Sequence, residues 1–348
     1  MDLLAVDVGC GTQDILIYDS RREIENCVKL VLPSQTQIIA QRIRQATRQK
    51  KGIFLEGNLM GGGPCVGAMA DHLDAGFNLY ATELAAKTVR DRPEEVESMG
   101  IKLVTSPPPG VLNIRLSDLD LEVLNKALSL FLVDLPRRYA AAVQDHGECL
   151  TGSNREFRFQ YWEQFLEAGG DIGGLIYDQA PYPWTRMQAV QRDLPGALVM
   201  DTGSAAIHGA LCDPRVAEEA DGRGAVILNV GNQHTLGVLL LRERVLGLFE
   251  HHTSLLTPDK LQRFVERLRT GRLLPGEAFQ DGGHGNLYHP DSHDVFPWEF
   301  VAVTGPRRRL ASSMDCYFTV LQGDMMLAGC FGLVRAALRF ISSSGIVF

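Results

Sequence analysis

The chain has 348 residues, of which 45% are hydrophobic, and its formal net charge is −8. That length is sufficient for two separate cores, since domains commonly span roughly 100 to 200 residues. The negative charge argues against nucleic acid as the main partner.

Apolar runs and segments of helical spacing alternate along the chain, which predicts an α/β fold. We expect strands at residues 3–8, 14–19, 27–32, 52–55, 139–143, 197–200, 225–230, 235–241 and 244–250. We expect helices at residues 35–49, 65–75, 84–98, 119–134, 155–168 and 258–269. Residues 271–298 are rich in Gly, His, Asp and Pro, which predicts a long functional loop or insertion.

Two segments of the chain share one pattern, in which an apolar run, a polar turn with Gly and Thr, and a second apolar run follow each other. They are LLAVDVGCGTQDILIYDS at the start and GAVILNVGNQHTLGVLLL near residue 225. Each reads as a hairpin. The candidate ligand-binding residues of the first turn are Asp7, Gly9, Gly11, Thr12 and Gln13; those of the second are Gly231, Asn232, Gln233, His234 and Thr235.

Turns of this kind have a recognisable chemistry. Their backbone N–H groups can cradle phosphate oxygens, and Asp7 is placed to hold a hydrated divalent cation through water. Two phosphate-binding hairpins in one chain predict two similar lobes that face each other across a cleft.

The chain resembles the actin-like ATPase superfamily, which includes acetate and sugar kinases, heat-shock chaperones and actin. Residues 7–14 match its first phosphate motif, DxGxxxxD, and residues 231–235 match its second in part, because Asn229 stands where an Asp is usual. Residues 201–211 resemble the first connecting helix, and residues 323–337 the second. The strand at 300–303 with Gly305 and Pro306 resembles the adenosine-contacting strand and turn.

This resemblance implies two actin-like, ribonuclease H-like lobes, each a mixed sheet with an N-terminal three-stranded meander flanked by helices. The expected boundaries are residues 1–212 for the first lobe, with insertions and a connecting helix, and 213–348 for the second. The implied cofactors are ATP and Mg²⁺, the latter held by Asp7 through water.

Asp145 and Asp201 are the candidate catalytic residues, because each follows a predicted strand at the edge where the phosphates are expected. Phosphoryl transfer needs a group that orients the attacking oxygen. Either carboxylate is a candidate general base, and the sequence does not rank them. The alternative for each is a helix N-cap, which Asp often supplies after a strand.

Further polar residues are candidates for substrate contact. In a meander the third strand ends beside the first turn, so His251 and His252 are expected near His234. There the imidazoles could contact phosphate or bind a metal, or they could be ordinary polar residues at the end of a strand. The remaining candidates are Gly61, Gly62, Gly63, Gln144, His146, Asn154 and Arg155. The loop at 281–294 interleaves His284, His289 and His293 with Asp281, Asp291 and Asp294, which leaves open a metal site or an ordinary exposed loop.

The phrases GNLMGGGP, QDHG and GDMMLAGCFGL resemble a prokaryotic family labelled pyruvate formate-lyase activating enzyme-like. Radical activating enzymes hold an iron–sulfur cluster on closely spaced cysteines. The seven cysteines here are widely scattered, with no CxxC, so radical chemistry is not expected unless distant cysteines meet in space. The odd number of cysteines also suits reduced thiols, and no basic segment precedes an apolar one at the start of the chain. The protein is therefore expected in the cytoplasm and not in a membrane.

The leading functional hypothesis is Mg-ATP-dependent phosphotransfer to a small metabolite, with a possible homodimer as the assembly. One alternative is an ATPase switch that acts as a reactivase or assembly factor for another enzyme. The third hypothesis is a degenerate member of the superfamily that no longer binds nucleotide. Its basis is Asn229, which stands where an Asp is usual.

Overall fold

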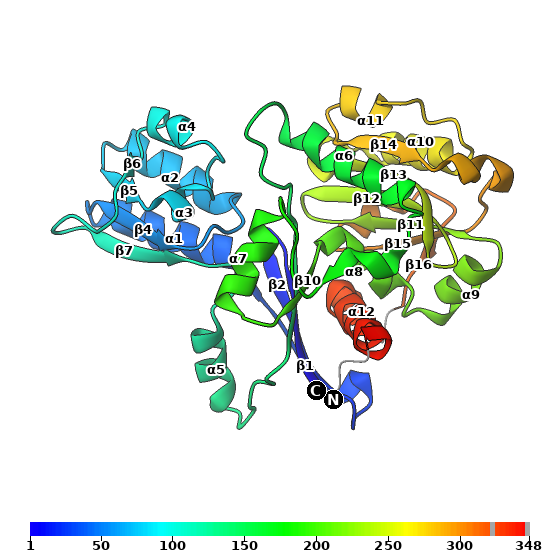
Figure 1. Cartoon of the computed structure of the whole chain (residues 1–348), viewed down its shortest axis with the longest axis horizontal. Helices are drawn as coiled ribbons and strands as arrows, with labels where there is room; N and C mark the ends of the chain where they lie inside the picture. Colours follow the sequence, from blue (N-terminus) through cyan, green and yellow to red (C-terminus); the bar gives the residue numbers. More distant parts are fainter. Residues whose placement is uncertain (321–323, 345–348) are drawn as a thin grey trace.

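The first six-stranded sheet begins with an antiparallel meander formed by the N-terminal hairpin and the strand after it (Figure 1). The computed structural model describes residues 1–320 and 324–344, and of residues 293–295 and 344 it describes the backbone alone. The strand order is β3-β2-β1-β8-β10-β9, with β8 and β10 parallel to β1. These strands are β1 (Asp2–Val8), β2 (Thr12–Asp19), β3 (Val28–Pro33), β8 (Tyr139–Val143), β9 (Ile176–Tyr177) and β10 (Leu198–Met200).

The second six-stranded sheet repeats this plan, in the order β14-β13-β12-β11-β15-β16. Its strands are β11 (Ala225–Val230), β12 (His234–Leu241), β13 (Arg244–His252), β14 (Gly285–Tyr288), β15 (Val301–Thr304) and β16 (Tyr317–Phe318). β11, β12 and β13 form the antiparallel meander, and β15 and β16 continue the sheet in parallel to β11. Two such sheets make the two-lobed actin-like architecture, so the predicted fold class is confirmed.

The central strands are apolar on both faces because helices cover both sides of each sheet. In β1, Leu3, Leu4, Ala5 and Val6 are all buried. They divide between two cores, since Leu3 and Ala5 contact one cluster and Leu4 and Val6 another. The continuous apolar run that opens the chain therefore reflects a strand at the centre of a layered lobe.

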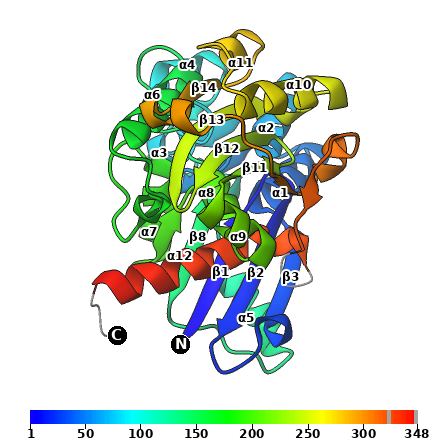
Figure 2. The ribbon, with the colours of Figure 1, turned by 90° about the vertical axis from the view of Figure 1, so that its right-hand side faces the viewer.

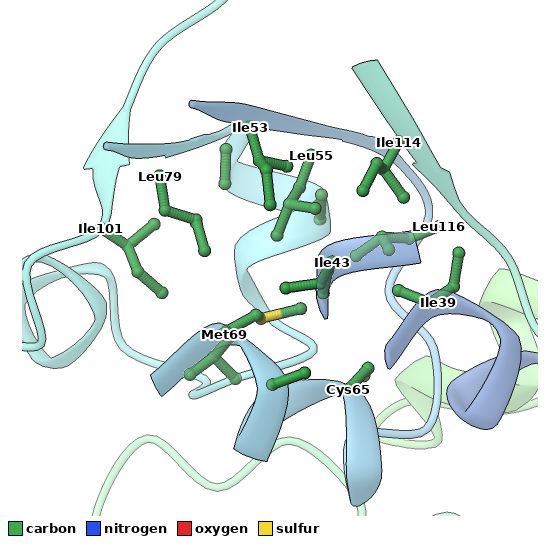
Figure 3. Close-up of a cluster of buried hydrophobic side chains, with 14 of the residues drawn as sticks. Ile39, Ile43, Ile53, Leu55, Cys65, Met69, Leu79, Ile101, Ile114 and Leu116 are labelled. Carbon is green, nitrogen blue, oxygen red and sulfur yellow. The ribbon is translucent and has the colours of Figure 1, made fainter. Parts of the chain in front are cut away.

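Residues between β3 and β8 form a separate layered unit beside the first sheet (Figure 1). Its parallel sheet has the order β6-β5-β4-β7, from β4 (Ile53–Gly57), β5 (Leu79–Ala81), β6 (Lys102–Leu103) and β7 (Leu112–Leu116). Helices α1 (Gln35–Arg48) and α2 (Pro64–Asp74) pack on it. Figure 3 shows Ile43 of α1 and Met69 of α2 pointing toward Ile53 and Leu55 of β4.

Several segments differ from the sequence prediction. The helix expected at 84–98 is divided into α3 (Glu83–Ala86) and α4 (Pro93–Ser98), because Thr82 caps the first and Pro93 starts the second. The long loop expected at 271–298 contains helix α11 (Glu277–Gln280), strand β14 and a short 3-10 helix at Pro290–Val295. The helix expected at 119–134 is α5 (Leu121–Ser129).

The remaining helices join the sheets. They are α6 (Asn154–Glu167), α7 (Thr185–Asp193), α8 (Thr202–Ala210), α9 (Pro214–Gly222), α10 (Pro258–Arg269) and α12 (Ala328–Ser344). Figure 2 shows α12 lying across β1 and β2 of the first sheet. Conversely, Phe159 and Trp162 of α6 pack into the core of the second sheet. The boundary expected between residues 212 and 213 stays a prediction.

Helices α8 and α12 cross at glycines. A Cβ on Gly332 would overlap the Ala205 carbonyl oxygen, and one on Gly209 would overlap that of Ala328. The backbones approach so closely that only glycine fits at either position.

Helix α12 also accounts for a membrane-like signal. The segment Met325–Ser343 is apolar and long enough to cross a membrane, but 56% of its window is buried inside the protein. It packs against α8 and the first sheet, as a core helix does.

Candidate functional site

A cleft of about 730 Å³ lies where the two turns meet, and residues from both lobes and from the inserted unit line it. The turns have the same internal hydrogen bond. Gly9 N–H donates to the Thr12 carbonyl at 2.8 Å, and Gly231 N–H donates to the His234 carbonyl at 2.9 Å. The repeat seen in the sequence is therefore a repeat in three dimensions.

The two turns face each other and touch. Gln233 Nε2 donates to Cys10 Sγ at 2.8 Å, and the Cβ position of Gly11 lies 3.5 Å from Asn232 Nδ2. Predicted ligand-binding residues that line the cleft are Asp7, Gly9, Thr12, Gly231, Asn232, Gln233, His234, Gly305 and Pro306. The geometry therefore brings both turns and the expected adenosine-contacting turn to one cleft.

Gln13 and Thr235 do not face the cleft, contrary to the sequence prediction. Gln13 Nε2 donates to the Pro33 carbonyl at 2.9 Å, and the hydroxyl of Thr235 lies 2.9 Å from that of Thr253. Both residues directly follow the last turn residue, so strand alternation turns both side chains to the face opposite the cleft.

Asp7 and Asp14 form a carboxylate pair on the floor of the cleft. They are directly opposite each other in the β1–β2 ladder. Among the described residues, Oδ1 of each is buried without a hydrogen-bond partner. Burial, and then the charge of Asp14, raise the pKa of Asp7, and burial raises that of Asp14 to about 7 against the opposing Thr12 hydroxyl. Two unpartnered carboxylate oxygens on adjacent strands fit a hydrated Mg²⁺, which prefers oxygen ligands and keeps several waters.

The Asp201 carboxylate is fully engaged. It caps α8 by accepting Gly203 N–H at 2.9 Å, and Arg158 donates to both oxygens at 2.9 and 3.1 Å. Oδ2 also accepts Asp145 N–H at 3.2 Å. A carboxylate has about four lone-pair positions, and all four are used here.

Asp145 keeps one position open. Oδ1 accepts Gly147 N–H at 2.9 Å, and Oδ2 accepts the N–H groups of Arg186 and Met187 at 2.8 and 2.9 Å. Burial raises the pKa of Asp145 to about 6, although the backbone bonds from Met187 and Gly147 oppose the shift. The remaining lone pair belongs to Oδ1.

The sequence analysis missed two arginines at the site, Arg158, which is buried, and Arg186, which is partly buried. Arg158 of α6 contacts Asp201 and, at 2.7 Å from Nε to Oε2, Glu250. Arg186 is held by a bidentate pair with Asp118, with both distances 2.8 Å. Glu250 could have indicated a buried arginine, because an acid inside a predicted apolar strand needs a cation as its partner.

The glycine run at 61–63 forms one wall of the cleft. Gly61 N–H donates to Asp118 Oδ1 at 3.1 Å, and its Cβ position would overlap the Arg186 guanidinium. Gly63 has a φ of +52° and starts α2, with its Cβ position 3.2 Å from Cys10 Sγ. This run therefore lies directly against the first turn.

The other substrate candidates divide into two groups. Gln144, His146, Asn154, Arg155 and His252 line the cleft. His251 does not, and the expectation that it contacts a ligand is wrong, since it is fully buried with Nε2 3.0 Å from Asp281 Oδ2. The meander pairs His251 directly with Thr235, so both side chains lie on the face of the sheet that is turned away from the cleft.

The histidines and acids of residues 281–294 do not gather at one point as far as the described side chains show. His284 lines the cleft, His289 Nδ1 accepts Asp291 N–H at 3.0 Å, and Asp281 pairs with Lys260. The side chains of His293 and Asp294 lie outside the described residues.

A family model described as "Putative pyruvate format-lyase activating enzyme (DUF1786)" matches residues 60–310, well over half of the chain. The chain belongs to this family. The match includes the glycine run, Asp145, Asp201 and the second turn. A search of curated proteins found no match.

Two solved structures have some likeness to this DUF1786 chain. The first is an inorganic polyphosphate/ATP-glucomannokinase from Arthrobacter sp. strain KM, with 12% identity, a TM-score of 0.35 and coverage of 97% of this chain and 99% of that chain. The second is an exopolyphosphatase-like protein, with 9% identity, a TM-score of 0.25 and coverage of 87% and 65%. At these scores the likeness adds nothing to the strand order as evidence for the fold.

The seven cysteines of this DUF1786 chain are free thiols. All seven belong to the described residues, and no three of them come together as a metal-ligand group. Cys10 lies at the first turn, whereas Cys65 and Cys330 are buried in two different cores.

Proposed function

We propose that the protein binds Mg-ATP in the cleft and transfers the terminal phosphoryl group to a small metabolite. One observation carries this proposal: two equivalent glycine turns, one from each lobe, face each other across a shared cleft and touch through Cys10 and Gln233. Their N–H groups supply anion-binding donors from both sides. We place the reaction in the cytoplasm, where the free thiols stay reduced.

The cleft residues divide into three roles in this proposal. Gly305, Pro306, Met325 and Met326 line the cleft, and we assign them to the nucleoside. Asp7 and Asp14 would hold Mg²⁺, which when bound neutralises phosphate charge. Asn154, Arg155 and His146 give the cleft a polar region for the acceptor, a feature that a substrate kinase needs and a nucleotide switch does not.

Asp145 is the better general base of the two candidates. Its Oδ1 has a free lone pair to accept a proton, whereas Asp201 has none. A pKa of about 6 also lies close to neutral pH, where a general base is most effective. Asp201 serves instead to position Asp145 through the Asp145 N–H and to cap α8.

The test is ADP formation from Mg-ATP with a panel of metabolites that bear a hydroxyl or carboxylate group. We expect acceptor-dependent ADP release, and we expect Asp145→Asn to lower kcat by about 10²- to 10⁴-fold with little change in ATP affinity. Asp291→Asn, an exposed acid outside the cleft, is the matched control. ADP release that no acceptor stimulates, or an Asp145→Asn variant with full activity, would contradict phosphotransfer.

A further inference from the structure

Three histidines that are far apart in the sequence converge on one wall of the cleft. His146 follows β8, His234 starts β12, and His284 directly precedes β14. One potential ligand nitrogen of each lies within 4.8 Å of those of the other two. Nε2 of His146 and Nε2 of His284 are 3.2 Å apart.

The convergence joins the two lobes. His146 follows strand β8 of the first sheet, whereas His234 starts β12 and His284 precedes β14 of the second. His252 lies against this group, with its ring centroid 5.0 Å from that of His234 and 4.7 Å from that of His284. All four imidazoles line the cleft, which gives an ion a route of entry.

The nitrogens of this group are short of partners. Among the residues described, neither ring nitrogen of His234 has a hydrogen-bond partner, nor does Nδ1 of His284. His284 is 1% exposed, so water does not replace the missing partner freely. Buried polar atoms are rarely left in this condition, and each one needs a partner.

The surrounding charge favours a cation. Arg158, a buried cation next to this group, is bound to two carboxylates, Asp201 and Glu250. This triad therefore carries one positive and two negative charges.

We propose that His146, His234 and His284 bind a transition-metal dication of the Zn²⁺ class, which links the two lobes. Neutral imidazole is a favoured ligand of such ions, whereas Mg²⁺ prefers oxygen. Tetrahedral Zn–N bonds of about 2.0–2.1 Å place ligand nitrogens about 3.3 Å apart. Nε2 of His146 and Nε2 of His284 are within hydrogen-bond distance of each other at 3.2 Å, which is close to this edge, so a bound ion would replace the proton that they share.

This site differs from the carboxylate pair of Asp7 and Asp14, because its ligands are imidazole nitrogens and not carboxylate oxygens. Three protein ligands would leave a fourth position for water or a substrate atom, and the cleft that the three histidines line would give access to it. An ion there would face the polar region and attract an anionic or oxygen-rich substrate group. Binding of the ion needs no nucleotide, so its test is independent of the proposed phosphotransfer.

The experiment is a Co²⁺ titration of the full-length, metal-stripped protein without nucleotide, followed by visible absorption and by calorimetry. We expect one Co²⁺ per chain, with the intense visible bands of a tetrahedral site and displacement by Zn²⁺. His284→Gln and His234→Gln should each weaken binding by at least about 100-fold. His289→Gln, five positions beyond His284 and outside the group, should bind as the wild type does.

The free cysteines require a discriminating readout. Thiolate ligation would produce a sulfur-to-cobalt band in the near ultraviolet and would persist in His284→Gln. That result, or equal Co²⁺ affinity in the wild type and both histidine variants, would overturn the proposal. Far-ultraviolet circular dichroism checks the fold of each variant, and His146→Gln replaces any variant that fails to fold.

Discussion

Arg158 is the buried side chain that links Asp145 and Asp201 of the first lobe to Glu250 of the second. Its guanidinium donates to the Asp145 carbonyl at 2.6 Å, to Asp201 and to Glu250. Burial acts to lower the pKa of Arg158, but Asp201 and Glu250 more than offset this effect and raise it. Removing such a cation would leave two carboxylates uncompensated, so this arginine fixes how α6, α8 and β13 meet.

His208 on α8 predicts a specific pH dependence of stability. Arg335 donates to Nδ1 at 2.9 Å and Nε2 lies 3.0 Å from the Ile172 carbonyl, so the neutral imidazole with a proton on Nε2 satisfies both contacts. Burial lowers its pKa from 6.5 to about 4. The unfolded chain binds a proton first as the pH falls, so stability present above pH 6.5 is lost on the way down to about pH 4.

In the wild type, His208 makes the free energy of unfolding fall by up to about 1.4 kcal/mol for each pH unit below 6.5. We expect His208→Gln to lack this contribution. Urea unfolding of both proteins at several pH values between about 4 and 7.5 measures it. The other histidines titrate equally in both proteins, so the difference isolates His208. A free-energy difference between wild type and variant that does not change with pH would contradict this assignment.

Single residues were predictable where the turn itself decided their placement. Gly9 and Gly231 lie where the repeat put them, because each turn needs a residue without a Cβ beside a carbonyl oxygen. Gln13 and Thr235 were assigned to the cleft because they adjoin the turns, but a side chain one position into a strand reverses its face. The same alternation removed His251 from the site.

At the scale of elements, two glycines determine how closely α8 and α12 approach each other. Gly332→Ala forces a methyl group into the backbone of α8 at Ala205, so we expect destabilisation by about 1–3 kcal/mol or more. Gly67→Ala in α2 is the matched control, because nothing lies within 4 Å of its Cβ position. That variant should gain about 0.5–1 kcal/mol from helix propensity.

Denaturant unfolding of the two glycine variants measures both effects. Equal stability of Gly332→Ala and Gly67→Ala would show that the helices are not in close contact.

Most strands and helices could be predicted, since long apolar runs and helical spacing are local signals. The break between α3 and α4 follows from Pro93, which also marks the start of a helix. Strand β14 was missed because only four residues, Gly285–Tyr288, form it, and their pairing with β13 is a tertiary effect.

At the scale of the whole molecule, the repeat of one hairpin was sufficient to predict two lobes and a cleft. The inserted unit with its own parallel sheet was not predicted as a separate layer, because its short strands are joined by helices and long connections. Nor did the sequence show that α6 packs on the second sheet while α12 packs on the first. The sheet on which a helix packs depends on long-range contacts that no local sequence pattern encodes. Here each of these two helices connects one lobe to the other.

The central claim is that one Mg-nucleotide lies between the two turns, and calorimetric titration of Mg-ATP into the wild type and Asp7→Ala tests it most directly. Asp2→Ala, an exposed acid on the same strand, is the control. We predict binding to the wild type and the control, loss of detectable binding in Asp7→Ala, and no loss of thermal stability, since Asp7 has a raised pKa and an unpartnered buried oxygen. Unchanged affinity in Asp7→Ala would contradict the account.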